Sequence, residues 1–453
     1  MGVRFSPPQP FLNLFSRQQV IYMEFTEIRE ILKGKEGKVR IHGWLHNKRS
    51  SGGILFLLLS DGTAFIQCTL KKEKIGEKVL KEIDKLPFQS VVELNGESKK
   101  DARSPYGFEI IVDEIKVEHE SAEDYPIGKK EHGPEFLLDN RQFWIRGQTA
   151  QTILKIKAAV LRFAREWFDK NGYTEFQSPI FTAAACEGGS TLFPVKYFDQ
   201  KVFLTQSWQL YAEAAIASLG KIYTVAPSFR AEKSRTRRHL TEYWHMEVEE
   251  PWCDLECILK TEEELVSYIC QKITKEFPED LKRLGRNPED LMKVKTPFPR
   301  VTYDEAIEIL QKEGVKIKWG DDITWENDKL LSSKFDRPFF LAYFPKGIKA
   351  FYHKPNPKNS KVTLSVDLMG PEGYGELTGG GQRIHDADEL LQRMKEEKMN
   401  IKEYQWYIDL RRFGTVPHSG FGLGVERVVA WICKLEHIRD AVAFPRMINR
   451  VYP

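Results

Sequence analysis

The sequence predicts an α+β protein in which a small β-barrel precedes a larger domain built on an antiparallel sheet flanked by helices. The barrel is predicted by short strand-like runs between residues 24 and 120 and by the turn signals that separate them. The larger domain is predicted by the region after residue 150, where helical and strand-like segments mix without the steady alternation of a parallel doubly wound sheet. A chain of 453 residues is also too long for one ordinary core.

The barrel is expected from four strand-like runs and one helical stretch. The runs cover residues 38–44, 54–59, 64–70 and 90–94, with a helix near 77–85 and about five strands in all. Barrels of this size bind single-stranded nucleic acid when a basic groove is combined with exposed aromatic rings. A purely structural barrel would instead bury Phe56 in its core, and the strand pattern alone leaves both interpretations open.

The domain boundaries follow from composition. Residues 24–120 form the expected barrel domain, residues 121–150 a linker with little apolar periodicity, and residues 151–453 the second domain, which opens on a helix over 151–171. Residues 1–23 are expected to be a disordered tail or a segment upstream of the true start at Met23. A targeting segment is the alternative.

Bulk composition narrows the class of protein. Lys and Arg together number 68 against 65 Asp and Glu, so RNA binding would depend on a local basic patch. The six cysteines are scattered and are expected to be reduced, mostly buried thiols. No apolar run is long enough to span a membrane, and no phosphate-binding P-loop is present. We therefore expect a soluble, cytoplasmic protein.

A cluster of cationic side chains is the strongest chemical signal. Arg230 and Glu232 end an apolar strand-like run, and Lys233, Arg237 and His239 lie in the polar stretch that follows. Such a concentration of positive charge suits a bound polyphosphate. A solvated basic hairpin is the alternative, but a strand-borne arginine beside a carboxylate is costly without a function.

These residues resemble those of the class II aminoacyl-tRNA synthetases. The second signature of that family is matched by residues 229–232 and 238–243, and the third, Gly-x-Gly-x-x-Arg, by residues 422–427. The first, a long helix leading to a proline at a dimer interface, is matched by residues 158–179. The resemblance implies an OB-fold barrel, the expected catalytic domain, and a homodimer with Pro179 at its interface.

The resemblance also implies an ATP site. Arg230 would bridge the α-phosphate and the substrate carboxylate, Tyr243 would stack on adenine, and Arg427 would cover its other face. The residues implied in ATP binding or catalysis are Arg230, Glu232, Arg238, His239, Tyr243, Glu376 and Arg427. Fixed guanidinium groups stabilise the charge that develops when a carboxylate attacks the α-phosphate.

Two acidic residues match the carboxylates that hold Mg²⁺ in the family. Asp367 and Glu376 supply the hard oxygen ligands that this ion prefers beside a triphosphate. A pair of surface acids is the alternative interpretation. ATP and Mg²⁺ are therefore the expected substrate and metal.

The expected amino acid is asparagine. Among the members that charge aspartate, asparagine or lysine, the aspartate enzymes carry a lysine where Ala212 stands here. Glu213 would accept a hydrogen bond from the side-chain amide and Arg383 would donate one, so that a neutral amide is preferred to a carboxylate. Gln209 would hold the α-amino group and Glu187 would belong to a closing loop. Alternatively, Glu213 pairs with an arginine and the pocket admits both amino acids.

In the barrel, the resemblance implies contacts with the anticodon of a tRNA. Phe56 and Gln67 would stack on and hydrogen-bond the middle base, and Lys48 and Arg49 would lie near the phosphates. Three other functions stay open: an aspartyl-tRNA synthetase with relaxed tRNA choice, an asparagine synthetase of the same fold that uses no RNA, and an inactive RNA-binding paralogue. The barrel disfavours the second, and the intact signatures disfavour the third.

Overall fold

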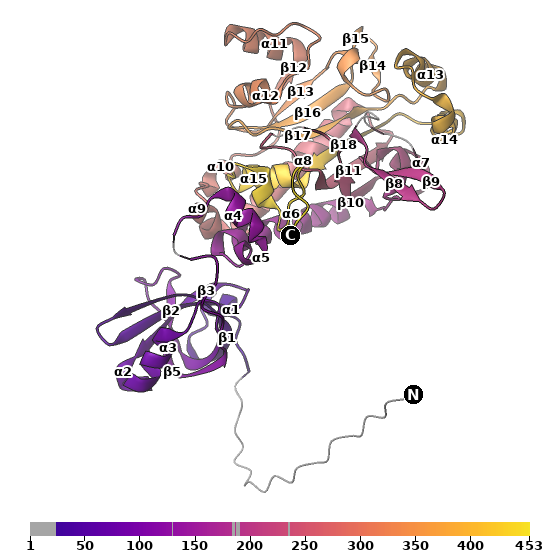
Figure 1. The fold of residues 1–453 in the computed structure, drawn as a ribbon. Coiled ribbons are helices and arrows are strands. Elements are labelled where there is room, and N and C mark those ends of the chain that lie inside the picture. The colour runs from indigo at the N-terminus through magenta and orange to yellow at the C-terminus, as the bar shows by residue number, and fades with distance from the viewer. Residues whose placement is uncertain (1–23, 129, 184–185, 187–190, 234–235) are drawn as a thin grey trace, which may run out of the picture. The chain divides into compact units, whose positions relative to one another are not determined.

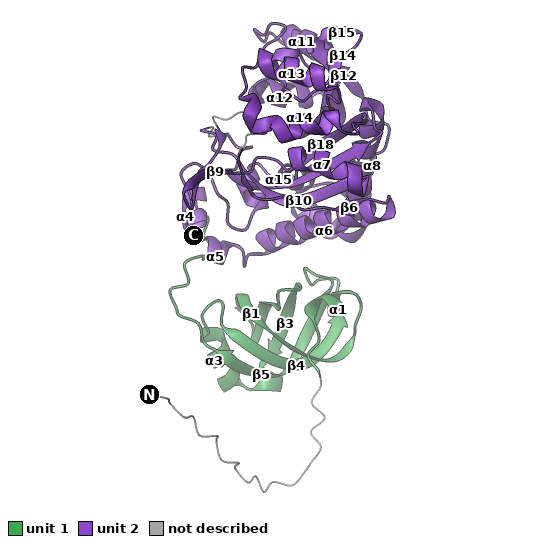
Figure 2. Cartoon of the chain, turned by 90° about the vertical axis from the view of Figure 1, so that its right-hand side faces the viewer, with its two compact units in different colours: residues 1–131 green, residues 132–453 purple. Residues whose placement is uncertain are grey.

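The computed structural model describes residues 24–128, 130–183, 186, 191–233 and 236–453. The chain forms two compact units, residues 1–131 and residues 132–453 (Figure 2). Their division falls inside the stretch predicted to be a linker, and helices α4 (Pro134–Asp139) and α5 (Arg141–Trp144) follow it within the second unit. The tail expected over residues 1–23 lies outside the described residues.

The first unit is a closed five-stranded barrel with the order β1-β2-β3-β5-β4. Leu55, Leu57 and Leu59 point into its core, because alternate residues of a strand share one face. The fifth strand was expected without a position, and its pairing with β3 is the one parallel ladder of the barrel. The strands are β1 (Gly37–Ser51), β2 (Ile54–Ser60), β3 (Phe65–Lys71), β4 (Val91–Lys100) and β5 (Phe108–His119). The helices are α1 (Ile28–Leu32), α2 (Lys72–Ile75) and α3 (Glu77–Lys85).

The second unit is built on an eight-stranded sheet with the order β12-β13-β16-β17-β18-β11-β10-β6 (Figure 1). The six central strands are antiparallel and the two edge strands pair in parallel, so the predicted α+β fold class is confirmed with a mixed sheet. The strands are β6 (Thr174–Glu175), β10 (Ile222–Phe229), β11 (Glu242–Pro251), β12 (Arg300–Thr302), β13 (Phe339–Ala342), β16 (Ser365–Gly370), β17 (Gly375–Gln382) and β18 (His418–Gly424).

One face of this sheet packs on long helices. The apolar face of helix α6 (Gln148–Lys170) forms one core with α8 (Leu255–Glu276), α15 (Val425–Ile432) and inward residues of β11 such as Met246 and Val248. Helix α6 begins three residues before its predicted start and ends at Lys170, just before the Asn-Gly stop. This core holds the central strands in place, so that their other face can carry polar residues.

Smaller elements complete the second unit. Helix α7 (Gln209–Leu219) packs against β11, and α13 (Ala387–Glu396) and α14 (Gln405–Arg412) share a separate apolar cluster. The remaining helices are α9 (Pro278–Arg283), α10 (Pro288–Met292), α11 (Tyr303–Lys312) and α12 (Trp325–Ser332). The remaining strands are β7 (Phe181–Thr182), β8 (Pro194–Tyr197), β9 (Gln200–Leu204), β14 (Pro355–Asn356) and β15 (Asn359–Thr363).

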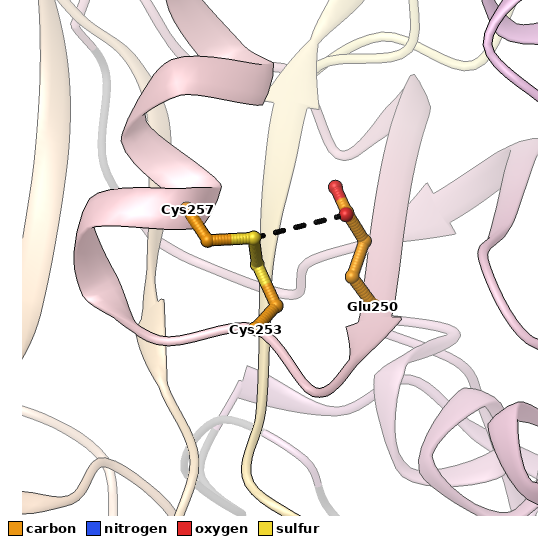
Figure 3. A group of neighbouring side chains, drawn as sticks. All are labelled: Glu250, Cys253 and Cys257. Carbon is orange, nitrogen blue, oxygen red and sulfur yellow. Dashed lines mark hydrogen bonds between the residues drawn. A yellow bond between two sulfur atoms is a disulfide. The ribbon is translucent and has the colours of Figure 1, made fainter.

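The cysteines differ in part from the expectation of six reduced thiols. Cys253 and Cys257 form a disulfide at the start of α8, beside the buried Glu250 (Figure 3). Their separation of four residues, about one helical turn, brings the two side chains together. The other four cysteines are buried and lie outside any disulfide. Within the described ranges, no helix is long and apolar enough to cross a membrane.

Candidate active site

A cavity of about 400 Å³ lies in the second unit, on the sheet face opposite the long helices. Strands β11, β16, β17 and β18 supply its floor, so residues distant in sequence meet there. Nine of the residues predicted to bind ATP, Mg²⁺ or the amino acid line it: Gln209, Arg230, Arg238, His239, Tyr243, Asp367, Glu376, Arg383 and Arg427.

Strand β11 presents a row of polar side chains to this cavity. Its alternation places Tyr243, His245, Glu247 and Glu249 on the cavity face, while Met246 and Val248 between them belong to the core and Glu250 accepts from Tyr173. The neighbouring strand β18 makes room for this row with glycine. A Cβ atom at Gly422 would collide with the ring of His245, so only glycine fits opposite it.

One end of the cavity is cationic. Arg427 Nη1 lies 3.0 Å from Glu376 Oε1, and the guanidinium groups of Arg238 and Arg427 both donate to the Glu376 carbonyl, at 2.8 and 3.2 Å. Burial disfavours the charged form of Glu376, but the surrounding arginines outweigh it and lower the pKa of that carboxyl to about 2. Burial and the same arginines keep the pKa of His239 below its usual range, against the pull of Glu232, 3.7 Å away. These groups suit the phosphates of a nucleotide.

Asp367 and Glu376 lie on adjacent strands on either side of Gly379. A Cβ atom at Gly379 would lie 3.4 Å from Asp367 Oδ1 and 3.7 Å from Glu376 Oε1, so the two carboxylates converge. Burial and the charge of Glu376 raise the pKa of Asp367 to about 7, although Lys349 opposes the shift with contacts of 2.7 and 2.8 Å to both carboxylate oxygens. Converging carboxylates that repel each other fit a divalent cation, and the surface-acid interpretation is not supported because Asp367 is buried.

The other end of the cavity holds a buried ion pair. Arg383 Nε and Nη2 each donate to one oxygen of Glu249 at 3.1 Å, and both side chains are almost fully buried. Trp208 N donates to Glu247 Oε2 at 2.9 Å, and Ser207 Oγ donates to the other oxygen. This end therefore combines one guanidinium with two carboxylates, a composition that suits an amino acid.

Glu213 lies behind this pair and does not line the cavity. Its carboxylate accepts from Tyr407 Oη at 2.8 Å and from Arg411, and it contacts His418 Nε2 at 3.0 Å. Gln209 Nε2, which does line the cavity, donates to it at 3.0 Å. In this structure Arg383 pairs with Glu249, while side chains from α14 and β18 surround Glu213. The expected contact of Glu213 with a side-chain amide stays a prediction.

Two other predicted positions lie away from the cavity lining, and a third is not among the described residues. Glu232 lies beside His239 and does not line the cavity. Pro179 is exposed and precedes two exposed apolar residues, Ile180 and Phe181. Glu187 lies outside the described residues.

Sequence reasoning missed Glu247, Glu249 and Lys349. The two glutamates had a signal, since acidic residues at alternate positions of an otherwise apolar strand share one face. Lys349 had none, because its distance to Asp367 depends on a loop between β13 and β15. Ala212, whose small side chain was the argument against an aspartate-binding lysine, packs in a buried cluster with Trp208 and Ile216.

The barrel brings its own predicted residues together on an outer face. Phe56 points away from the leucine core, and the Arg49 guanidinium lies 4.5 Å from its ring centroid and 3.4 Å from Gln67 Oε1. The interpretation of Phe56 as a core residue is therefore wrong. Lys48 Nζ donates to the carbonyl oxygens of Leu86, at 2.7 Å, and Asp84, so it anchors α3. An aromatic ring beside a guanidinium and an amide suits a nucleic-acid base.

Each of the two units matches a known protein family. Residues 133–448 match the family described as tRNA synthetases class II (D, K and N), and residues 39–118 match the OB-fold nucleic acid binding domain. The asparagine–tRNA ligase of Desulforamulus reducens is 45% identical over 431 residues, covering 95% of this chain and 100% of that protein.

Solved structures show the same relationship. Asparaginyl-tRNA synthetase from Pyrococcus horikoshii, complexed with asparaginyl-adenylate, has a TM-score of 0.90 and 46% identity, covering 95% of this chain and 100% of that chain. The Entamoeba histolytica asparaginyl-tRNA synthetase with asparaginyl-adenylate has a TM-score of 0.86 and 33% identity, covering 95% and 99%. The present chain combines an OB-fold barrel with a cavity on an antiparallel sheet core. It belongs to the class II aminoacyl-tRNA synthetases of the aspartate, lysine and asparagine group.

Proposed function

We propose that this chain is an asparagine–tRNA ligase, which activates L-asparagine with ATP and transfers it to tRNA(Asn). The observation that carries the proposal is one cavity with a cationic end and an end where Arg383 pairs with Glu249. The similarity to asparagine–tRNA ligases over almost the whole chain supports the same conclusion.

The cationic end would bind ATP. Arg230 and Arg427 would lie against the phosphates, and Tyr243, whose ring centroid is 5.7 Å from the Arg230 guanidinium, would stack on adenine. The asparagine carboxylate attacks the α-phosphorus, the bond to the pyrophosphate oxygen breaks, and asparaginyl-adenylate and pyrophosphate result. Prepositioned guanidiniums stabilise the charge on the phosphoryl oxygens during this step.

The other end would select the neutral amide. The guanidinium of Arg383 could donate to the side-chain carbonyl oxygen, and Glu249, with Glu213 behind it, keeps the local potential negative. An aspartate carboxylate there would face these acids with Arg383 already shared. This arrangement disfavours the rival aspartyl-tRNA synthetase, and Gln209 links Glu213 to the cavity.

Asp367 and Glu376 would hold Mg²⁺. This ion, when bound, would neutralise charge on the phosphates and help to orient them. The chain's own contribution is to keep the two carboxylates converging and to supply Lys349 as a cation beside Asp367.

The second reaction needs a tRNA. The terminal ribose hydroxyl would attack the carbonyl carbon of the adenylate and displace AMP. The barrel would bind the anticodon through Phe56, Gln67 and Arg49. The matched nucleic-acid-binding domain favours this function over an asparagine synthetase that uses no RNA.

A homodimer and a cytoplasmic location complete the proposal. The exposed apolar segment at Pro179–Phe181 could pair with a second copy, which light scattering of the purified protein would detect. A cytoplasmic location would supply the chain with tRNA and ATP.

ATP–pyrophosphate exchange with asparagine and aspartate in parallel, followed by charging of tRNA(Asn) and tRNA(Asp), tests the function. We expect exchange with asparagine and charging of tRNA(Asn). Exchange that favours aspartate would overturn the specificity and leave the ATP chemistry intact. Synthesis of free asparagine from aspartate and ammonia would identify the third alternative.

A further inference from the structure

Helix α12 brings an acidic side chain to the ATP end of the cavity. This helix belongs to the segment between α8 and β13, which contains none of the family signatures. Asp328, in its middle, is 8% exposed and faces the start of β17. Its Oδ2 accepts from Arg238 Nη1 at 2.7 Å and from Glu376 N at 3.2 Å. A buried acid from a distant segment thus contacts two residues of the site.

These contacts fix the orientation of Arg238. One terminal nitrogen of its guanidinium is bound by Asp328, and the other, Nη2, donates to the Glu376 carbonyl at 2.8 Å. Arg427 Nη1 donates to the same carbonyl at 3.2 Å. The two guanidiniums therefore share one anchor, and both line the cavity. A planar fork held at two points loses little further freedom when an anion binds.

The backbone makes room for this pair. Gly375 has a φ of +68°, and a Cβ atom there would lie 2.6 Å from Asp328 Oδ2 and collide with the Arg238 guanidinium. Gly375 N also donates to Ser332 Oγ of α12 at 3.2 Å. The contact between Asp328 and Arg238 therefore needs both the positive φ and the missing side chain at residue 375. A buried ion pair gives little net stability, so its place beside the site points to a functional reason.

We propose that Asp328 is a positioning residue for ATP, which holds the Arg238 guanidinium beside Arg427 so that the phosphates meet two ordered cations. The inference rests on the proposed ATP site, but it does not depend on which amino acid is activated. It gives the segment around α12 a part in substrate binding.

Calorimetric titration of the full chain with Mg-ATP, without amino acid, tests the proposal. We expect Asp328→Asn to weaken binding about tenfold, the loss typical of one charge-assisted contact. The control is Glu326→Gln, an exposed acid of the same helix, which should bind ATP like the wild type. A change below about twofold in Asp328→Asn would overturn the proposal.

A double-mutant comparison separates positioning from mere support of the fold. If Asp328 acts through Arg238, then Asp328→Asn should add little to the loss caused by Arg238→Ala. Additive losses would show that Asp328 acts elsewhere and would overturn the proposal. If Asp328→Asn does not fold, Arg238→Lys serves instead: it keeps the charge without the fork, so wild-type affinity in this variant would overturn the proposal. ATP binding without any exchange with asparagine would refute the proposed amino acid and leave this test valid.

Discussion

Arg383 and Glu249 form a bidentate ion pair at the end of the cavity that we propose binds the amino acid, with Nε and Nη2 of the arginine each 3.1 Å from one carboxylate oxygen. The pair comes from the end of β17 and the middle of β11, and Gly420 on β18 leaves space for it because a Cβ atom there would collide with the Glu249 carboxylate. An arginine held in this way is ordered before substrate binds, while the acid beside it opposes a second carboxylate.

Replacing Glu249 should therefore weaken discrimination between amide and acid. In Glu249→Gln we expect the preference for asparagine over aspartate, measured as the ratio of kcat/KM in ATP–pyrophosphate exchange, to fall about tenfold. The matched control is Glu250→Gln, a buried acid of the same strand that faces Tyr173 instead of the cavity. If both variants keep the wild-type ratio, Glu249 has no part in specificity.

Glu213 should matter more for stability than Glu249. Arg411 and His418 hold the pKa of Glu213 well below its usual range despite burial. Because this pKa is lower in the folded chain than in the unfolded chain, the carboxylate stabilises the fold at pH values above the unfolded-state pKa. This stabilisation is lost as the pH falls through the pKa of the folded chain.

We expect Glu213→Gln to reduce the free energy of unfolding by about 3 kcal/mol at pH 7, because Arg411 stays buried without its partner. Denaturation at pH 7 measures this loss. Because Gln209 links Glu213 to the cavity, the KM for the amino acid should also rise. An unchanged denaturation midpoint would contradict the network.

Phe56 should affect tRNA but not amino-acid activation. Base stacking on an aromatic ring contributes about 1–3 kcal/mol, so Phe56→Ala should lower kcat/KM for tRNA charging by roughly 5- to 150-fold and leave ATP–pyrophosphate exchange unchanged. The matched control is Phe25→Ala, since Phe25 is another exposed barrel ring with a guanidinium 4.4 Å from its centroid. Equal losses in the two variants would place the anticodon elsewhere.

Glu262 should make the fold less stable as pH rises. Its carboxyl group, on α8, is buried. Oε1 accepts a hydrogen bond from the Thr378 hydroxyl, whereas Oε2 has no hydrogen-bond partner among the described residues. Burial raises its pKa from 4.5 to about 8. Between these values the unfolded chain has released the proton and the folded chain still holds it, so stability falls with rising pH across this window.

The substitution Glu262→Gln removes that dependence. We expect it to match the wild type near pH 5 and to be more stable near pH 8, by at least about 1 kcal/mol, in denaturation experiments. Glu263→Gln is the control, because that carboxylate accepts from Phe298 N at 2.8 Å and its loss should destabilise at both pH values. A constant difference between Glu262→Gln and the wild type would contradict the assignment.

The sequence by itself determined the α+β architecture and most of the residues that line the cationic end of the cavity. Signature residues such as Arg230, Tyr243 and Arg427 lie in or next to strands and helices whose periodicity is local, so their roles can be expected from sequence neighbours. The strand pattern left the position of Phe56 open, and the structure placed its ring outside the core.

Only the tertiary structure decided which charges meet. Glu249 with Arg383, Glu213 with Arg411, and Asp328 with Arg238 each join segments far apart in the chain. Coulomb attraction and desolvation depend on distance and burial, and neither can be read from sequence spacing when a sheet brings the strands together. For this reason the amino acid could be expected from the residues present, while the partner of Arg383 could not.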